Sequence, residues 1–246
     1  MPGAAARGVS EAPADLQRSG LLRDPSELFG ELLSAAPISV GLAAIDPGLD
    51  ALSHHLTAQE LPPEKSLAPK RLREIVAGRL LTRLVLAQMG QRPQPLVARA
   101  DRSPAWPEGL VGSVTHSDGL CAVAIAHRRD VAELGIDIEP DGPVRPELWP
   151  KIARRDERAA MPDTQDEAGG RHVRLLFSAK EAYYKAQYPR TQKVLWHQDV
   201  RICFDEGVAA FEASVAPDIG AHVPEPGRGI VGGGHGHLST SWLVLP

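Results

Sequence analysis

The stretch VGSVTHSDGLCAVAIAHRRDVAELGIDIE, residues 111–139, alternates apolar runs with short polar turns. Runs of this length, rich in β-branched residues and separated by turn signals, predict three consecutive antiparallel strands. In the third of them, Asp137 and Glu139 alternate with Ile136 and Ile138. Side chains alternate between the two faces of a strand, so we expect both carboxylates on one face and both isoleucines on the other.

A long amphipathic helix is predicted on each side of this stretch. KRLREIVAGRLLTRLVLAQMG, residues 70–90, has an apolar side and a plausible C-cap in Gly90, and HVRLLFSAKEAYYKAQY, residues 172–188, should stop at Pro189. DVRICF, GVAAFEASV and STSWLVLP are predicted strands after the second helix. A long helix followed by antiparallel strands thus occurs twice, which predicts an α+β fold of two similar lobes.

The other segments set the expected domain boundaries. We predict a partly disordered N-terminal tail over residues 1–35, an N-terminal lobe over 36–133 and a C-terminal lobe over 134–246. SELFGELL within the tail has helical character, whereas the first twenty residues have a disordered composition. PDTQDEAGGR is predicted as a polar loop, and APDIGAHVPEPGRGIVGGGHGHL as a long loop with a mobile tip. We assign no metal to His235 and His237 in that loop.

Composition excludes some broad classes of function. The chain has 246 residues, is 43% hydrophobic and carries a net charge of −4, which argues against nucleic-acid binding driven by global charge. It has no apolar run of the roughly 20 residues that a membrane span needs, and no secretory signal at its N-terminus. Cys121 and Cys203 lack metal-ligand spacing, so we expect small core residues of a reducing, cytoplasmic protein.

The acids of GIDIEP need a partner if they are buried. Two ionised carboxylates on neighbouring same-face positions repel each other, and a proton, a basic side chain or a hard cation relieves the repulsion. Mg²⁺ commonly takes a few carboxylates together with phosphate oxygens and water. A strand end whose acids simply face water is the alternative interpretation.

The second helix supplies further charges. In FSAKEAYYKA, Glu181 and Lys185 are four residues apart and share a face, and an ordinary surface pair would explain that spacing alone. Lys180 and Glu181 also lie along the apolar stripe that contains Phe177 and Tyr184, where a charge is costly without a partner. Three carboxylates and two ammonium groups would make a site for a metal-bound phosphate.

Two elements before residue 120 suit an anion. A hydroxyl, an imidazole and backbone N–H groups, as at Ser113 and His116 in GSVTHS, can hold a phosphate. Arg71 and Arg79 are eight residues apart, about two helical turns, and therefore face the same way. A hydrogen-bonded structural histidine and a solvated basic face are the alternative interpretations.

Together, GSVTHS, GIDIE and FSAKEAYYK resemble the 4′-phosphopantetheinyl transferases of the Sfp type, and KRLREIVAGR with PAWPEGLVGSVTH is most similar to the enterobactin-synthase-transferase subgroup. The resemblance implies a pseudo-twofold, two-lobed α+β fold, each lobe a long helix packed on an antiparallel sheet. It also implies Mg²⁺-dependent transfer of the phosphopantetheine arm of coenzyme A to a serine of an acyl or peptidyl carrier protein, with release of adenosine 3′,5′-bisphosphate. Mn²⁺ is the alternative ion.

The resemblance also implies roles for single residues. It makes Glu181 and Lys185 catalytic, with Glu181 as the base for the carrier serine, directly or through a water. The residues that match the family's metal ligands are Asp137, Glu139 and Glu181. The residues that match its coenzyme A contacts are Arg71, Arg79, Arg99, Ser113, His116, Lys180 and Lys185; Arg99 requires a one-residue gap in the match.

Two other functions use the same residues. A Mg²⁺-dependent phosphohydrolase acting on a nucleotide would use the acids with water as the nucleophile, and a non-enzymatic interaction module would use a metal for stability alone. The expected partners are coenzyme A and carrier domains, without nucleic acid or membrane. A duplicated fold can form a complete site in one chain, so we expect a monomer. Carriers of fatty-acid, polyketide and nonribosomal-peptide synthesis are all candidate substrates.

Overall fold

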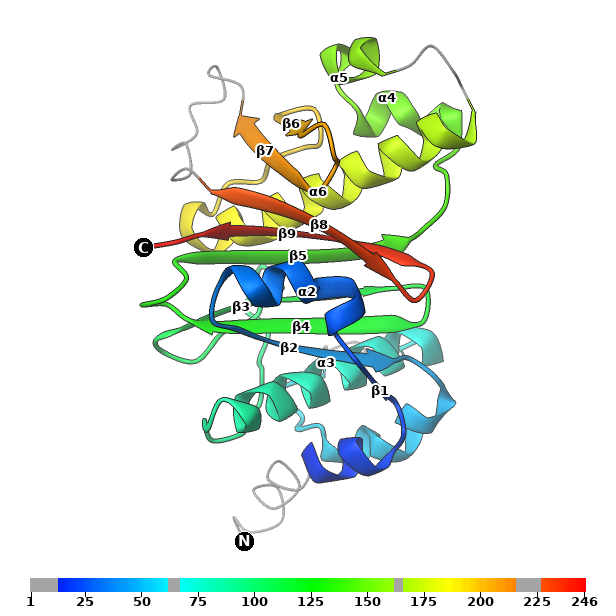
Figure 1. Ribbon diagram of the computed structural model, residues 1–246. Coiled ribbons are helices and arrows are strands. Elements are labelled where there is room, and N and C mark those ends of the chain that lie inside the picture. The colour runs from blue at the N-terminus through cyan, green and yellow to red at the C-terminus, as the bar shows by residue number, and fades with distance from the viewer. Residues whose placement is uncertain (1–12, 62–66, 162–165, 216–226) are drawn as a thin grey trace, which may run out of the picture. The chain divides into compact units, whose positions relative to one another are not determined.

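Two antiparallel sheets, each with a long helix packed on it, form the computed structural model (Figure 1), which describes residues 13–61, 67–161, 166–215 and 227–246. Unit 1 comprises Met1–Pro25 and Ile38–His127, and unit 2 comprises Ser26–Pro37 and Arg128–Pro246. The division therefore falls after residue 127, whereas the sequence predicted it after residue 133. Residues 26–37, which the sequence placed in the tail, are part of unit 2.

Unit 1 is a four-stranded sheet under one long helix. The strands, in spatial order, are β1 (Leu22–Arg23), β2 (Ile38–Ala44), β4 (Leu120–His127) and β3 (Leu110–Ser117). Helix α3 (Pro69–Gln88) lies within one residue of its predicted start, and the 3₁₀ helix η1 (Pro47–His55) precedes it. Leu80, Leu81 and Val85 of α3 pack with Val123 and Ile125 of β4 in the core.

Unit 2 is a five-stranded sheet. The strands, in spatial order, are β5 (Glu133–Pro140), β9 (His237–Val244), β8 (Arg228–Gly234), β7 (Ala210–Val215) and β6 (Val200–Phe204). The helices are α2 (Ser26–Ala35), η2 (Pro146–Leu148), α4 (Trp149–Ile152), α5 (Arg155–Ala160) and α6 (Glu167–Thr191). Val173, Leu176 and Tyr183 of α6 pack with Trp242 and Phe211 of the sheet.

The two units share a topology. In unit 1 the strand before the long helix, β2, pairs with β4, the second strand of the hairpin that follows. In unit 2 the strand before the long helix, β5, pairs with β9, the second strand of the β8–β9 hairpin. The order β2-β4-β3 thus corresponds to β5-β9-β8, with β7 and β6 added in unit 2. The predicted α+β fold with a repeated helix and antiparallel sheet is confirmed.

Helices α6 and α2 cover opposite faces of the five-stranded sheet. A Cβ on Gly135 would lie 1.9 Å from the carbonyl oxygen of Ala182, so α6 packs directly on the face that carries the odd-numbered residues of β5. A Cβ on Gly232 would lie 2.3 Å from the carbonyl oxygen of Leu28 in α2. Gly232 shares the face of Ile138, because both are in register with Ser239. The acids of β5 are therefore on the α6 face.

Helix α6 is longer than predicted at both ends. It begins inside the predicted polar loop, where the Asp166 side chain accepts a hydrogen bond from the Gly169 N–H as an N-cap. Gly170 is required in the first turns because a Cβ there would lie 2.5 Å from Pro143. The helix also runs through Pro189 and ends at Gln192, whose φ is 55°. The prediction that Pro189 stops the helix is wrong by one short turn.

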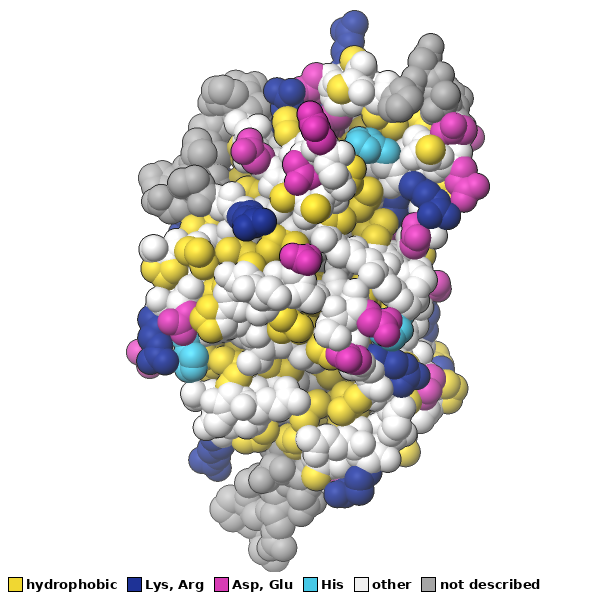
Figure 2. Space-filling model, in the orientation of Figure 1, with side chains coloured by type: hydrophobic (Ala, Val, Ile, Leu, Met, Phe, Trp, Pro, Cys, Tyr) yellow, Lys and Arg dark blue, Asp and Glu magenta, His cyan; other side chains and the backbone are white. Residues whose placement is uncertain are grey.

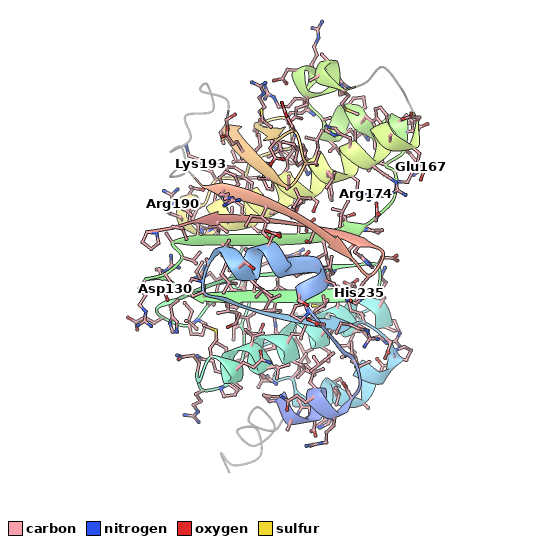
Figure 3. All side chains as sticks on the ribbon, viewed as in Figure 1. Asp130, Glu167, Arg174, Arg190, Lys193 and His235 are labelled. Atoms are coloured by element: carbon pink, nitrogen blue, oxygen red, sulfur yellow. The ribbon has the colours of Figure 1, made fainter. Side chains whose placement is uncertain are left out.

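Other differences concern the predicted tail, the long loop and one cysteine. Residues 1–12 of the tail and 216–226 of the long loop lie outside the described residues, whereas residues 13–18 are helical and 228–234 form β8. GGGHGH is thus the end of β8 and a turn into β9, with His235 at the hairpin tip (Figure 3). Cys121 is buried as predicted, but Cys203 is exposed.

The surface carries mixed charge. Acidic and basic side chains are interspersed on the face shown in Figure 2, which agrees with the small net charge of −4. None of the helices in the described part of the chain is both long enough and apolar enough to span a membrane.

Candidate functional site

The carboxylates of β5 lie side by side beneath α6. Asp137 is 4% exposed and Glu139 is half-buried, and both point to the face of the sheet on which α6 packs. The close approach depends on Gly135, which shares that face and has no side chain to hold the helix away. The role of Gly135 was not predicted from the sequence. The signal was present, because a glycine within a strand indicates close approach of another backbone.

Lys185 of α6 connects the predicted acids. Its Nζ donates a hydrogen bond to Asp137 Oδ1 at 2.6 Å and another to the Ile136 carbonyl oxygen at 3.3 Å. Its charge also acts on Glu139 and Glu181, and it lowers the pKa of each carboxyl group. One ammonium group is therefore within electrostatic reach of all three predicted metal ligands.

Arg174 is a member of this cluster that sequence analysis missed. Its Nη1 donates to Glu139 Oε2 at 2.8 Å, and its Nε donates to the Gly142 carbonyl oxygen at 3.2 Å. Figure 3 shows Arg174 toward one end of α6 and Arg190 at the other. The available signal was spacing, since Arg174 precedes Glu181 by seven residues, two helical turns, on the same face.

The two glutamates are perturbed in opposite directions. Burial raises the pKa of Glu139, the negative charge of Asp137 raises it further, and Arg174 and Lys185 offset only part of this effect. Burial also raises the pKa of Glu181, but a hydrogen bond from His197 and the charge of Lys185 outweigh burial, and the pKa falls below its ordinary value. Glu181 therefore keeps its charge to a lower pH than Glu139 does.

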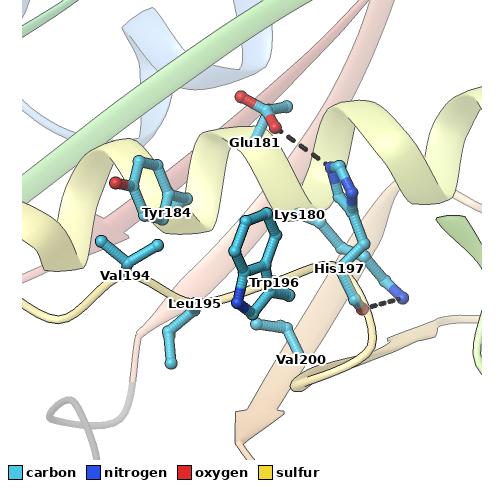
Figure 4. Close-up of a pocket in the computed structure, with 8 residues that line it drawn as sticks. All are labelled: Lys180, Glu181, Tyr184, Val194, Leu195, Trp196, His197 and Val200. Atoms are coloured by element: carbon cyan, nitrogen blue, oxygen red, sulfur yellow. Dashed lines mark hydrogen bonds and ion pairs between the residues drawn. The ribbon is translucent and has the colours of Figure 1, made fainter. Parts of the chain in front are cut away.

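A pocket opens beside Glu181 (Figure 4). It has about 220 Å³ of space and lies between α6 and the segment that leads into β6. His197 Nε2 lies 3.1 Å from Glu181 Oε1 at its edge. Its lining residues are Lys180, Glu181, Tyr184, Val194, Leu195, Trp196, His197 and Val200.

Lys180 does not join the acid cluster. Its side chain is 1% exposed, and its Nζ donates to Glu157 Oε2 at 2.6 Å, to the Ile152 carbonyl oxygen at 3.0 Å and to the His197 carbonyl oxygen at 2.9 Å. An ammonium group has three N–H donors, and all three are used. The structure therefore contradicts the prediction that Lys180 contacts coenzyme A, and Lys180 instead ties α6 to its neighbouring segments.

The basic residues of unit 1 form a separate cluster around α3. Arg71 Nη1 lies 3.1 Å from His116 Nε2 and 3.0 Å from Glu74 Oε2, so the Arg71 guanidinium contacts both side chains. Arg79 has a buried Nε, and its guanidinium makes no hydrogen bond to any residue that the structure describes. Burial lowers the pKa of Arg79, the negative charge of Glu60 opposes part of this effect, and the positive charge of Arg71 lowers the pKa further. A desolvated guanidinium of this kind is suited to an added anion.

Ser113 and Arg99 are not part of that cluster. Ser113 and His116 are three residues apart on β3, so their side chains point to opposite faces of the sheet. Val114, which shares the His116 face, lies against Gly78 of α3. Arg99 is exposed in the loop before β3. The structure thus supports Arg71, Arg79 and His116 as one group and leaves Ser113 and Arg99 apart from it.

The acid cluster fits Mg²⁺ in donor chemistry and charge. Carboxylate oxygens are the ligands that Mg²⁺ prefers. Three carboxylates with Arg174 and Lys185 leave one net negative charge. The carboxylate oxygens of the three acids nevertheless do not all lie within 4.8 Å of one another. Within the described ranges, the three potential ligands with atoms all within 4.8 Å of one another are Asp15, His54 and His55 of unit 1, whose imidazoles favour a transition metal over Mg²⁺.

Comparison with known proteins gives consistent matches in both units. Residues 61–126 match the model of the 4′-phosphopantetheinyl transferase N-terminal domain, and residues 133–222 match that of the 4′-phosphopantetheinyl transferase superfamily. The chain is 34% identical over 186 residues to 4′-phosphopantetheinyl transferase Svp of Streptomyces mobaraensis, covering 72% of this chain and 73% of the relative. It is 34% identical to 4′-phosphopantetheinyl transferase PptT of Mycobacterium tuberculosis, over 74% of this chain and 75% of the relative. Enterobactin synthase component D of Salmonella typhi is 34% identical over half of each chain.

Proposed function

The chain belongs to the 4′-phosphopantetheinyl transferase superfamily, and on that premise we propose that it transfers the 4′-phosphopantetheine arm of coenzyme A to a serine of acyl or peptidyl carrier proteins. The reaction releases adenosine 3′,5′-bisphosphate, requires Mg²⁺ and takes place in the cytoplasm. The carrier serine attacks the phosphoryl group directly, so no nucleophile of this chain is needed.

The observation that carries the proposal is the position of Lys185 among three acids. Its ammonium donates to Asp137 at 2.6 Å and acts on Glu139 and Glu181. In the reaction, Lys185 offsets negative charge that develops on the transferred phosphoryl group. Asp137, Glu139 and Glu181 would hold Mg²⁺, which would supply Lewis-acid stabilisation of the negative charge on the diphosphate and on the departing bisphosphate.

Glu181 receives the proton of the attacking serine. Its lowered pKa keeps it ionised at neutral pH, so it can accept a proton, although a carboxylate of low pKa is a weak base. Proton transfer through a water is therefore as suitable as direct transfer. The pocket beside Glu181 has apolar walls at Val194 and Leu195, which suit the pantetheine arm.

The 3′-phosphate is assigned to the basic cluster of unit 1. Arg79 has a mostly buried guanidinium with no hydrogen bond in the described structure, and Arg71 and His116 lie 3.1 Å apart. A phosphate would give Arg79 a charge-assisted hydrogen bond and would compete with Glu74 for Arg71. The assignment is supported by the positive charges of Arg71 and Arg79, which would attract the phosphate.

The proposal is tested by incubating the protein with coenzyme A, Mg²⁺ and a panel of fatty-acid, polyketide and nonribosomal-peptide carriers, followed by intact-mass measurement of each carrier. We expect a mass gain of one phosphopantetheine on at least one carrier, and none with Asp137→Ala. Coenzyme A consumption without a carrier would instead indicate a phosphohydrolase. A melting temperature that responds to Mg²⁺ without any coenzyme A binding would indicate an interaction module.

A further inference from the structure

The segment after α6 places an imidazole against Glu181. His197 Nε2 lies 3.1 Å from Glu181 Oε1. A carboxylate only accepts hydrogen bonds, so Nε2 carries the proton and donates it. Figure 4 shows the second oxygen of Glu181 turned away from His197. That oxygen has no hydrogen-bond partner in the described part of the chain.

His197 is held in this position independently of Glu181. Its carbonyl oxygen accepts a hydrogen bond from Lys180 Nζ at 2.9 Å, and Lys180 is itself fixed by Glu157 at 2.6 Å. Its ring lies against Phe177, with ring centroids 5.2 Å apart. Asp199 accepts a hydrogen bond from the Trp196 N–H at 2.7 Å and closes the turn around His197. These contacts, none of which involves Glu181, hold the imidazole in place.

Resting on the proposed function, we propose that His197 is a positioning residue that donates Nε2–H to Glu181 Oε1, so that Glu181 Oε2 is the oxygen left for Mg²⁺. A free glutamate side chain samples several rotamers and can turn either oxygen toward a cation. A fixed donor on one oxygen removes that freedom before the cation arrives. Hydrogen bonds to metal-binding carboxylates commonly change metal affinity by about tenfold or more.

The buried Lys180 takes a part in this arrangement that differs from its predicted one. Its ammonium is too enclosed to meet coenzyme A, but through the His197 carbonyl it holds the segment that carries the imidazole. Lys180 and Glu181 are neighbours in the sequence, but their side chains contact different parts of the same segment. Lys180 binds the His197 carbonyl oxygen and anchors the segment, and Glu181 accepts the hydrogen bond from the His197 imidazole.

The test compares His197→Gln, which keeps an N–H donor at a similar reach, with His197→Leu, which keeps apolar volume without a donor. His127→Leu is the matched control, because it removes an imidazole at the end of β4 in unit 1. Mn²⁺ and Mg²⁺ affinities are measured by calorimetry in the presence of coenzyme A, beside melting temperature and single-turnover transfer. We expect His197→Leu to lose about tenfold in metal affinity, and His197→Gln and His127→Leu to stay within about threefold of wild type.

Two outcomes overturn the inference alone while wild-type protein transfers normally. In one, His197→Leu binds metal as wild type does. In the other, His197→Gln and His197→Leu lose affinity equally, which indicates a loop anchor without a hydrogen-bonding role. A measurement on ¹⁵N-labelled wild type needs no variant. We expect the Nε2-protonated form of His197 with and without metal, and the Nδ1-protonated form would contradict the inference. Wild-type protein that modifies no carrier would overturn the proposed function as well.

Discussion

Glu139 and Glu181 show how two glutamates of one site acquire different properties. Both are partly buried, and burial raises the pKa of each. Glu139 has Asp137 as its neighbour, whose like charge adds to the effect of burial. Glu181 has His197 and Lys185, which stabilise its ionised form. Glu181 is therefore the better candidate for a proton acceptor, because it is ionised before the reaction begins. An added cation would stabilise the ionised form of Glu139 the most.

His172 should make the stability of unit 2 depend on pH. Burial lowers its pKa below 6.5, and the charge of Glu157 reverses only part of this effect. Between the folded pKa and 6.5, the unfolded chain binds more protons, so the free energy of unfolding falls as pH falls through that window. In urea unfolding at pH 7.5 and 5.0, we expect His172→Gln to lose less stability than wild type. An equal loss in both proteins would show that His172 does not contribute.

At the scale of elements, the contact between β5 and α6 forms the acid cluster. Gly135→Ala would place a Cβ 1.9 Å from the Ala182 carbonyl oxygen and 2.7 Å from the Ala186 nitrogen, so the helix must shift away from the strand. We expect a loss of about 3 kcal/mol or more in unfolding free energy, together with loss of transfer. Urea unfolding and a carrier assay measure both effects.

Gly142→Ala is the control for that substitution, because a Cβ at Gly142 meets nothing within 4 Å and its φ is not in the left-handed region. It should leave stability and transfer near wild type. A Gly135→Ala protein as stable and active as the Gly142→Ala protein would show that β5 and α6 can separate without cost.

The Lys180–Glu157 pair connects α6 to α5 and should act through stability. Lys180→Met leaves the Glu157 carboxylate, which is 3% exposed, without its cationic partner. We expect a loss of about 3 kcal/mol in unfolding free energy, partly recovered in the Lys180→Met/Glu157→Gln double variant. Coenzyme A affinity of the folded protein should stay near wild type by calorimetry. Normal stability with weakened coenzyme A binding would restore the predicted coenzyme contact.

Elements whose position is set by a local sequence pattern could be predicted, and elements set by packing against distant residues could not. The apolar periodicity of α3 and the alternation of β5 reflect burial on one side, and both were predicted closely. Strand β8 was missed because its sequence, RGIVGGG, has low strand propensity. Its glycines are required because the backbone of α2 packs on them at Gly232 and Gly234. No local pattern indicates a contact between residues some 200 positions apart.

The sequence predicted which acidic residues form the candidate site better than it predicted which side chains they contact. Same-face spacing placed Asp137 beside Glu139, and helical spacing placed Glu181 near Lys185. The partners Arg174 and His197 depend on how distant segments meet, so spacing alone did not assign them. Lys180 was misassigned because its ammonium group is paired with Glu157, which is 23 residues away in the sequence. No local pattern indicates that pairing.

At the scale of the whole molecule, the two family models divide the chain much as the structure does. Residues 61–126 fall in unit 1, with the basic cluster of α3, and residues 133–222 fall in unit 2, with the acid cluster. The proposed reaction needs cations for the nucleotide and acids for the metal. Helix α3 carries Arg71 and Arg79 of the first set, whereas the second set is divided between β5, with Asp137 and Glu139, and α6, with Glu181.

Residues of unit 1 should therefore recognise the 3′-phosphate of coenzyme A. We expect Arg79→Ala and His116→Ala to raise KM for coenzyme A about tenfold or more, because each loses a charge-assisted hydrogen bond to that phosphate. KM for 3′-dephospho-coenzyme A should change far less. Arg73→Ala is the control on the same helix, since Arg73 is already paired with Asp50 at 2.7 Å. Equal losses with both substrates would assign Arg79 and His116 to another part of the nucleotide.

The central claim, that the acid cluster performs the chemical step, is tested most directly by Glu181→Gln. This substitution keeps the shape of the side chain and removes its charge and basicity. Coenzyme A affinity by calorimetry should stay within about tenfold of wild type, about 1.4 kcal/mol, while single-turnover transfer to a carrier should fall about a hundredfold or more. A Glu181→Gln protein that transfers at the wild-type rate would contradict the claim and leave α6 with a structural role alone.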